Sequence, residues 1–473
     1  MKTKAKYCAA IASVFAFAAF AQAQEDTVSN VYGGTTSRVQ LVSEAGKPDL
    51  VLNPNQTDPT AEARFSADSY KTFRSITTTG NPSLWNIALG KATIDIAQSG
   101  GGEFVAFANN GTMSWNVVKF DVVNSAGSDA TALLDLGTLS LRTNTDGIDT
   151  WLTIGTRAKV SGILVNTWEG GTEQRGICIT NNADVTYNVS ETAFGPMGRL
   201  KVDGGSTLNV KGKLTFNGAG SKLILGGTMS YDAAAMGQSL TLRDASITGT
   251  LITKGGVGSN LTLAGAATLS GNGIINANGA IIIDSGSLTV SDNGKISIVD
   301  DKTYDPRIRM GGGTLTLNAE NAVQVDSTRY SLANIVVYGG NGSKVIVNED
   351  NKFRLLFFQS NHDITLDVAE DATVFFEQIG IGSGGGGTLL IENFGDERIF
   401  FASSDNWGAI SISATDKNGK TFTKDELKLV AGRYIDGTSG YWLNAVVPEP
   451  ADYAAILGAI AIAFALKRRC SRK

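Results

Sequence analysis

The sequence predicts an all-β protein whose central part is a right-handed parallel β-helix, a solenoid of stacked coils. Short segments that alternate polar and apolar residues recur between clusters of Gly, Asn, Asp and Ser, a pattern typical of strands with one buried face. They recur about every 20 residues, which indicates degenerate repeats. Gly occurs 56 times and Pro only 8 times, which favours turns between paired strands over disorder. Examples are STLNV at 206–210, SLTV at 287–290, TLTL at 314–317 and DITLDV at 363–368.

A β-sandwich array is the alternative architecture for such a chain. It would show hairpin pairs and Pro-bearing turns at more regular intervals. Loosely spaced strands that each offer one apolar face favour the solenoid, because stacked coils bury those faces against one another.

The predicted order of segments follows from these patterns. Residues 1–23 are a signal peptide, and residues 24–88 form an N-terminal cap segment. The β-helix repeats occupy residues 89–401, which at about 22 residues per coil gives roughly 14 coils. Residues 402–446 form a C-terminal cap in which NGK at 418–420 is a tight turn, and residues 447–473 are a sorting and anchor segment.

The first 23 residues have the three parts of a secretory signal. A Lys-rich start precedes an apolar run from Cys8 to Ala21, which predicts a signal helix, and small residues stand at Ala21 and Ala23. We therefore expect cleavage after Ala23, by the export machinery that includes the secretion translocon.

The last residues combine three features in a fixed order. Pro448, Glu449 and Pro450 come first, and an apolar run from Tyr453 to Leu466 follows. This run is 14 residues long and apolar or Gly on every side, so it predicts a short hydrophobic helix that needs lipid or complete burial. Its bulky positions are Tyr453, Leu457, Ile460, Phe464 and Leu466, and the positive residues after it are Lys467, Arg468, Arg469, Arg472 and Lys473.

This order resembles the PEP-CTERM sorting signal of Gram-negative bacteria. The resemblance covers about the last 26 residues. It implies that an exosortase-type membrane protease recognises the motif and processes the protein near it, after the basic residues have held the tail on the cytoplasmic side. The implied location is the inner membrane transiently, and then the cell surface, the outer envelope or the medium, often alongside exopolysaccharide.

Charge and cysteine content limit the partners of the exported part. Removing residues 1–23 takes away three Lys, and removing 451–473 takes away five Lys or Arg and one Asp. Of 40 basic residues 32 remain, and of 45 acidic residues 44 remain, a net charge of −12. Such a surface repels phosphate backbones, so we expect no nucleic-acid partner. Only Cys178 remains between the two removed segments, so no internal disulfide is possible, and a large core or a long hydrogen-bonded ladder must hold the fold.

Enzymes that cut polysaccharides are a second function class to consider, because many of them are β-helices. NTDGID at 144–149 resembles the first carboxylate motif of polygalacturonases, and RGICIT at 175–180 resembles the strand that begins with paired Asp in that family. Arg175 and Gly176 stand at those Asp positions, and the Gly-His-Gly of the family is absent, since His362 is the one histidine. Asp146 and Asp149 therefore lack the second carboxylate that hydrolysis requires, and we interpret NTDG as an Asx turn.

A lyase would need a base beside a carboxylate-bound cation. The nearest approach to this is Asp300, Asp301 and Asp305 with Arg307 and Arg309, which we interpret as a solvated loop. His362, between Asn361 and Asp363, is interpreted as part of a turn.

We expect no metal and no cofactor. DKNGKTFTKDEL at 416–427 has Gly419 at the fourth position of a calcium loop, where the sixth is needed, and Leu427 at the twelfth, where a Glu is needed. Six tryptophans could stack on sugars, but scattered Trp residues indicate core or cap packing. They are Trp85, Trp115, Trp151, Trp168, Trp407 and Trp442.

The expected function is that of an exported, non-enzymatic β-solenoid with a structural or adhesive role in the envelope or extracellular matrix. Its Gly/Asn/Thr-rich repeats are similar to those of autotransporter-like passenger domains. A polysaccharide-degrading hydrolase or lyase is the alternative function. A groove with several carboxylates and a cationic base would distinguish the two, and the sequence displays none.

Overall fold

The computed structural model describes residues 38–40, 49–52, 62–64, 71–78, 85–109, 112–142, 150–165, 175–233, 239–255, 259–300, 305–340, 342–359 and 361–446. The predicted signal peptide and the predicted sorting segment at 447–473 lie outside these residues. So do the Ala21 and Ala23 cleavage residues, the Pro448-Glu449-Pro450 motif, the apolar run and the basic tail.

The described part of the chain is all β with almost no helix, and its strands form about 12 turns of a parallel β-solenoid, divided between two compact units. The parallel pairing confirms the predicted solenoid and excludes the β-sandwich array. Unit 1 is Met1–Ala234 and unit 2 is Ala235–Lys473.

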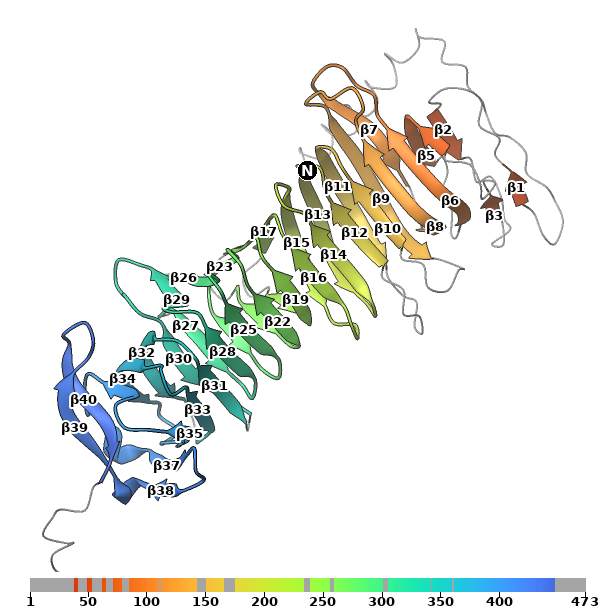
Figure 1. Ribbon diagram of the computed structural model, residues 1–473. Helices are drawn as coiled ribbons and strands as arrows, with labels where there is room; N and C mark the ends of the chain where they lie inside the picture. The colour runs from red at the N-terminus through yellow and green to blue at the C-terminus, as the bar shows by residue number, and fades with distance from the viewer. Residues whose placement is uncertain are drawn as a thin grey trace, which may run out of the picture. The chain divides into compact units, whose positions relative to one another are not determined.

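The described strands of unit 1 form three parallel ladders (Figure 1). The long strands β6, β8, β9, β11, β13 and β15 each contribute to two of the ladders. In chain order the strands are β1 (Arg38–Gln40), β2 (Asp49–Leu52), β3 (Glu62–Arg64), β4 (Lys71–Phe73), β5 (Ser75–Thr78), β6 (Trp85–Asp95), β7 (Glu103–Ala108), β8 (Thr112–Val123), β9 (Thr131–Arg142), β10 (Thr150–Ile154), β11 (Ala158–Val165), β12 (Arg175–Ile179), β13 (Asp184–Phe194), β14 (Gly198–Val202), β15 (Thr207–Phe216), β16 (Lys222–Leu225) and β17 (Thr228–Ala233).

Parallel pairing starts inside the segment that the sequence assigned to an N-terminal cap. Strand β1 pairs with β3, β2 with β5, and β4 with β6, all in parallel. Phe73 and Ile76 of this segment are buried, at 2% and 0% exposed. The ladders of unit 1 therefore begin before residue 89, because short alternating runs such as DLVL supply strands of the same kind as the repeats.

Unit 2, taken by itself, also consists largely of parallel ladders of its own strands. In chain order these are β18 (Leu240–Leu242), β19 (Asp244–Ile247), β20 (Thr250–Gly255), β21 (Leu261–Leu263), β22 (Ala266–Leu269), β23 (Ile274–Asn278), β24 (Ile281–Ile283), β25 (Ser287–Ser291), β26 (Lys295–Val299), β27 (Arg307–Met310), β28 (Thr314–Asn318), β29 (Val323–Asp326), β30 (Asn334–Val337), β31 (Ser343–Val347), β32 (Asn351–Phe358), β33 (Asp363–Val368), β34 (Val374–Ile381), β35 (Thr388–Phe394), β36 (Ile399–Phe401), β37 (Ser411–Asp416), β38 (Thr421–Thr423), β39 (Leu427–Arg433) and β40 (Ser439–Ala445), with 3₁₀ turns η2 (Trp407–Ala409) and η3 (Lys424–Glu426).

Register explains the polar–apolar alternation of the unit 2 segments. Along β22, β25 and β28, Ala267 pairs with Leu288 and Leu288 with Leu315, and all three are at most 2% exposed. Thr268, Thr289 and Thr316 alternate with them and form the matching outward row. Each coil thus buries one residue in two against its neighbours, which is the period that a half-buried strand requires.

Aromatic side chains stack in the interior of unit 2. The rings of Phe353, Phe376 and Phe401, from β32, β34 and β36, are 5.7 and 5.8 Å apart between centroids, and each is at most 1% exposed. Parallel register places identical positions of successive coils about 4.8 Å apart, so like residues stack on like residues.

A buried amide closes the turn before β32. Asn351 is 0% exposed. Its Oδ1 accepts a 2.8 Å hydrogen bond from the backbone N–H of Ala322, and its Nδ2 donates to the carbonyls of Ala319 at 3.0 Å and Glu349 at 2.9 Å. One side chain therefore satisfies backbone groups of two successive coils where the strand ladder is interrupted.

Antiparallel strands end the parallel ladders of unit 2. Strand β38 pairs with β37, and β40 pairs with both β36 and β39, all antiparallel. The NGK turn joins β37 to β38, with Gly419 at φ 82°. The β39–β40 hairpin (Figure 1) supplies Tyr434 and Trp442, whose rings pack on the buried Phe375 and Phe400. These pairings close strand edges that would otherwise be open to another chain.

Candidate functional site

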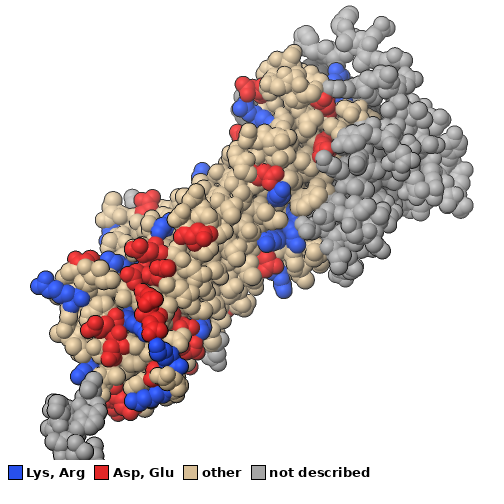
Figure 2. Space-filling view, viewed as in Figure 1, with Lys and Arg blue, Asp and Glu red and all other residues tan. Residues whose placement is uncertain are grey.

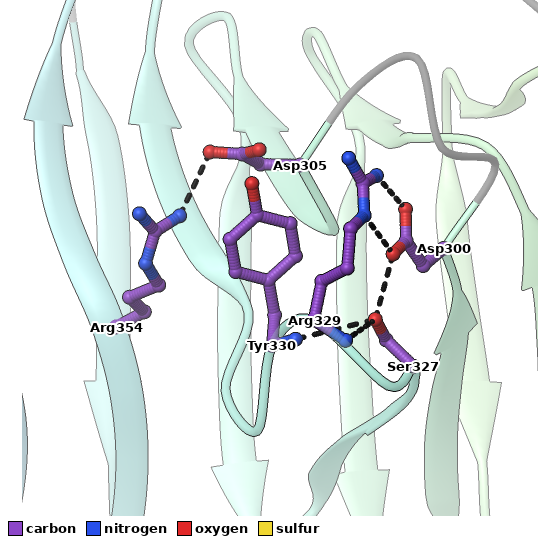
Figure 3. Close-up of polar contacts among 6 residues, drawn as sticks. All are labelled: Asp300, Asp305, Ser327, Arg329, Tyr330 and Arg354. Atoms are coloured by element: carbon purple, nitrogen blue, oxygen red, sulfur yellow. Dashed lines mark hydrogen bonds and ion pairs between the residues drawn. The ribbon is translucent and has the colours of Figure 1, made fainter.

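One group of charged and aromatic side chains in unit 2 has the composition of a catalytic site. Figure 3 shows Asp300, Asp305, Ser327, Arg329, Tyr330 and Arg354, which we call the arginine–tyrosine cluster. Asp300 directly follows β26, and Asp305 lies two residues before β27. Ser327, Arg329 and Tyr330 lie in the connection from β29 to β30, and Arg354 lies within β32. Stacking of coils brings together residues from connections that are far apart in sequence.

Asp300 is the best-satisfied carboxylate of the cluster. Arg329 contacts it with both arms of the guanidinium, Nε to Oδ2 at 2.7 Å and Nη2 to Oδ1. The Ser327 hydroxyl donates to the same Oδ2 at 2.7 Å. The Asp300 side chain is 5% exposed, whereas that of Arg329 is 41% exposed. A bidentate arginine–carboxylate pair of this kind fixes the relative orientation of the two side chains as well as pairing their charges.

Tyr330 connects the other two charged residues. Its hydroxyl points toward Asp305 (Figure 3), and Arg354 Nη1 lies 2.7 Å from Asp305 Oδ2. The guanidinium carbon of Arg354 is 4.4 Å from the centre of the Tyr330 ring, and that of Arg329 is 5.1 Å from it. Both cations are within the range of a cation–π contact with this ring.

The electrostatics hold these groups in fixed protonation states. The hydrogen bond to Asp305 raises the pKa of Tyr330, and the hydrogen bond to Asp300 raises the pKa of Arg329. Burial alone would raise the pKa of Asp305, but hydrogen bonds from Tyr330 and Arg354 outweigh burial and leave this pKa below its usual value. At neutral pH Tyr330 keeps its proton and Asp305 is ionised.

This arrangement differs from that of a lyase or a glycosidase site. A lyase base must be ready to take a proton, and inverting or retaining hydrolysis needs one protonated carboxyl beside an ionised one. In the cluster the phenol is held protonated, and each carboxylate is neutralised by its own arginine. What the geometry does achieve is to tie the β26–β27 connection, the β29–β30 connection and strand β32 together.

A second tyrosine makes a similar contact across coils. The Tyr338 hydroxyl, just after β30, donates to Asp284, just after β24, and the Arg309 guanidinium carbon lies 4.0 Å from the ring centre. Burial, followed by the Asp284 hydrogen bond, raises the pKa of Tyr338 to about 12. A Cβ on Gly311 would come within 2.6 Å of Asp284 Oδ1 and 3.0 Å of the Tyr338 hydroxyl, so Gly311 leaves the room that this contact needs.

The structure regroups the residues that the sequence placed together at 300–309. Asp300 and Asp305 do meet arginines, but these are Arg329 and Arg354, and Arg309 packs on Tyr338 instead. Asp301 lies outside the described residues. No local sequence feature points to Arg329, Tyr330 or Arg354, because these residues come near Asp300 and Asp305 only through the stacking of successive coils.

The resemblance to polygalacturonases fails sterically at one of its positions. Gly176 of β12 lies opposite Arg199 of β14, and a Cβ built on Gly176 would be 1.8 Å from the Arg199 carbonyl oxygen. An Asp at this position would force the two strands apart. Asp146 and Asp149 lie outside the described residues, and His362 lies between β32 and β33.

In the calcium-like loop at 416–427, backbone N–H groups of the loop itself bond to a carboxylate oxygen that a calcium ion would need. Asp416 Oδ1 accepts hydrogen bonds from the N–H groups of Asn418 at 2.8 Å and Lys420 at 2.9 Å. Leu427 is buried at the start of β39. Over the described residues as a whole, no group of three or more His, Cys, Asp or Glu side chains could hold a metal ion.

Two of the six tryptophans pack in the cap of unit 2. Trp442 meets Phe400 edge to face at 4.9 Å between ring centres, and its indole N–H donates to the Arg433 carbonyl. Trp407 meets Phe401 in the same way at 6.0 Å. Both therefore contribute to cap packing.

Comparison with known proteins adds no relative. No protein-family model, curated protein or solved structure matches this chain. Within the part of the chain that the structure describes, no helix is both long and apolar enough to cross a membrane.

Proposed function

We propose that this protein is an exported, non-enzymatic β-solenoid with a structural or adhesive role at the cell surface or in the extracellular matrix, sorted by its PEP-CTERM-like tail. The observation that supports this most is the antiparallel cap of unit 2. Its strand β40 pairs with β36 and β39, and Ala445 at its end stands three residues before Pro448 in the sequence. A capped β-solenoid whose cap is followed in the sequence by the sorting motif is the arrangement expected of an exported domain that carries a C-terminal sorting signal.

The contacts of unit 2 support a structural role. The polar groups that could serve in catalysis instead pair with one another across coils, as Asp300 with Arg329 and Asp305 with Arg354. Backbone ladders and stacked aromatic rings replace the disulfides that a secreted chain of this kind lacks. A surface protein must keep its fold without chaperones or ATP, and these contacts serve that need.

The proposed partners follow from the tail and from the charge. They are the secretion translocon, an exosortase-type membrane protease and an extracellular polysaccharide. Residues 343–446 of unit 2 include 15 Asp or Glu against 9 Lys or Arg. Figure 2 shows many of the acidic side chains of the described residues side by side on one face. This acidic excess disfavours a nucleic-acid partner.

Replacing Pro448, Glu449 and Pro450 together by Ala tests the sorting part of the proposal. We expect export to persist, because the N-terminal signal is unchanged, while uncut protein accumulates in the inner membrane. Deleting residues 451–473 should instead release the protein into the periplasm, since it removes the apolar run. Immunoblots of separated inner-membrane, periplasmic, outer-membrane and medium fractions measure both results.

A matched control is the triple replacement of Asp425, Lys428 and Arg433 by Ala. These cap residues are exposed, and their loss should leave location and length as in the wild type. The proposal is wrong if the protein with Ala at 448–450 reaches the surface shortened in the same way as the wild type.

A further inference from the structure

The fold holds the chain up to the second residue before the sorting motif. The Val446 N–H donates to the Glu426 carbonyl at 2.8 Å, and the Ala445 N–H donates to Asp396 Oδ1 at 2.8 Å. Asn444 Oδ1 accepts a 3.1 Å hydrogen bond from the Glu397 N–H. The end of β40 is therefore fixed on both sides, by the start of β39 and by the turn before β36.

Strand β40 is an inner strand of the cap. It pairs with β39 from Leu427↔Ala445 to Arg433↔Ser439, and its Tyr441 and Trp442 pair with Phe401 and Phe400 of β36. Leu443 is 0% exposed. The residues up to Val446 thus belong to a closed antiparallel unit.

Such a position conflicts with how a protease binds its substrate. A protease takes several residues on each side of the cut as an extended strand, whose backbone groups bond to the enzyme. Only Val447 separates Val446 from Pro448, and one residue spans at most about 3.6 Å. The residues that would enter the enzyme before the cut have their backbone groups engaged within the cap.

We propose that the β39–β40 hairpin gates processing, so that the end of β40 from Asn444 to Val446 must unpair before the chain is cut. The cut itself adds one water across a peptide bond and leaves a new carboxylate and a new amine. The gate rests on the proposed sorting function and adds a rule to it: the processing rate follows the local opening of the cap. Openings of this kind cost less than global unfolding.

A disulfide across the end of the hairpin tests this proposal. Lys428 and Asn444 are direct partners on β39 and β40. Antiparallel partners lie about 4.5–5.5 Å apart between Cα atoms, within the range that a disulfide bridges. We would introduce Lys428→Cys and Asn444→Cys into full-length protein that carries Cys178→Ser. Pulse–chase labelling should show processing at least about tenfold slower when the disulfide is formed, with the rate recovered in reducing medium.

Weakening the same end should act in the opposite direction. Asp396→Ala removes the acceptor of the Ala445 N–H, and we expect processing to become about three- to tenfold faster, the factor for one net hydrogen bond. Asp405→Ala, on an exposed turn of the same cap, should leave the rate as in the wild type.

An insertion variant distinguishes a failure of the proposed gate from a failure of the proposed sorting function. Eight Gly and Ser residues between Val447 and Pro448 should restore wild-type processing to the disulfide-locked protein, because the motif can then enter the enzyme with the cap closed. Processing of the locked protein at the wild-type rate without the insertion would overturn the gate and leave sorting intact. Slow processing of the locked protein despite the insertion would also overturn it. If neither the wild type nor the insertion variant is cut, the sorting function itself fails.

Discussion

Replacing Asn351 by Ala should lower the free energy of unfolding by about 3–5 kcal/mol, the sum of leaving three buried backbone groups without partners. The amide serves the N–H of Ala322 and the carbonyls of Ala319 and Glu349, and it is 0% exposed. Alanine leaves a void that is lined by these polar groups. Chemical denaturation of the purified protein, followed by circular dichroism at the strand band, measures the loss.

Asn348→Ala is the matched control for this prediction. Asn348 lies three residues earlier, and its Nδ2 donates at 2.6 Å to Asn318 in a contact open to solvent. Its loss should change stability by no more than about 0.5 kcal/mol. Equal effects at the two positions would show that the buried amide does not hold the turn.

Replacing Phe376 by Ala should cost about 3–5 kcal/mol, because a fully buried ring is lost and the cavity cannot fill. Phe376 is the middle ring of three, with Phe353 and Phe401 on either side and centroid distances of 5.7 and 5.8 Å. Both stacking contacts vanish in the variant, whereas loss of an outer ring would remove one. Denaturant midpoints of the variant and the wild type give the difference.

Leu390→Ala serves as the control for the stack. Leu390 points outward from β35 and is 36% exposed, so its truncation should cost about 1 kcal/mol or less. A loss of stability in Phe376→Ala no larger than that of Leu390→Ala would contradict the stacked core.

The fold could be predicted from the sequence because the alternation is local. TLTL at 314–317 and SLTV at 287–290 are strands β28 and β25 almost to the residue. The number of coils was predicted less accurately: the sequence indicated roughly 14 coils, and the structure has about 12 turns. This number depends on the length of the connections between strands, which the alternation does not reveal. The step from Thr268 to its partner Thr289 is 21 residues, whereas the step from Thr289 to Thr316 is 27. Connections of variable length, not strands, set the coil length.

The arginine–tyrosine cluster could not be predicted because its members meet only through register. Asp300 and Arg329 are 29 residues apart, and Asp305 and Arg354 are 49 apart. Arg307 and Arg309 lie close to Asp305 in the sequence, whereas the stacking of coils places Arg354 of β32 beside it. The connections that follow β26 and β29 and the strand β32 come together only in the folded solenoid. The proposed sorting signal differs from the cluster, because its three parts follow one another directly along the sequence. Such a signal can be predicted without knowledge of the fold.

The mass of the intact protein isolated from the cell surface tests the central proposal most directly. Export and sorting predict one chain that begins at Gln24, after cleavage behind Ala23, and ends within a few residues of Pro448, Glu449 and Pro450. Such a chain retains both units and lacks the apolar run and the basic tail. A surface protein whose mass still includes Lys473 would contradict the account.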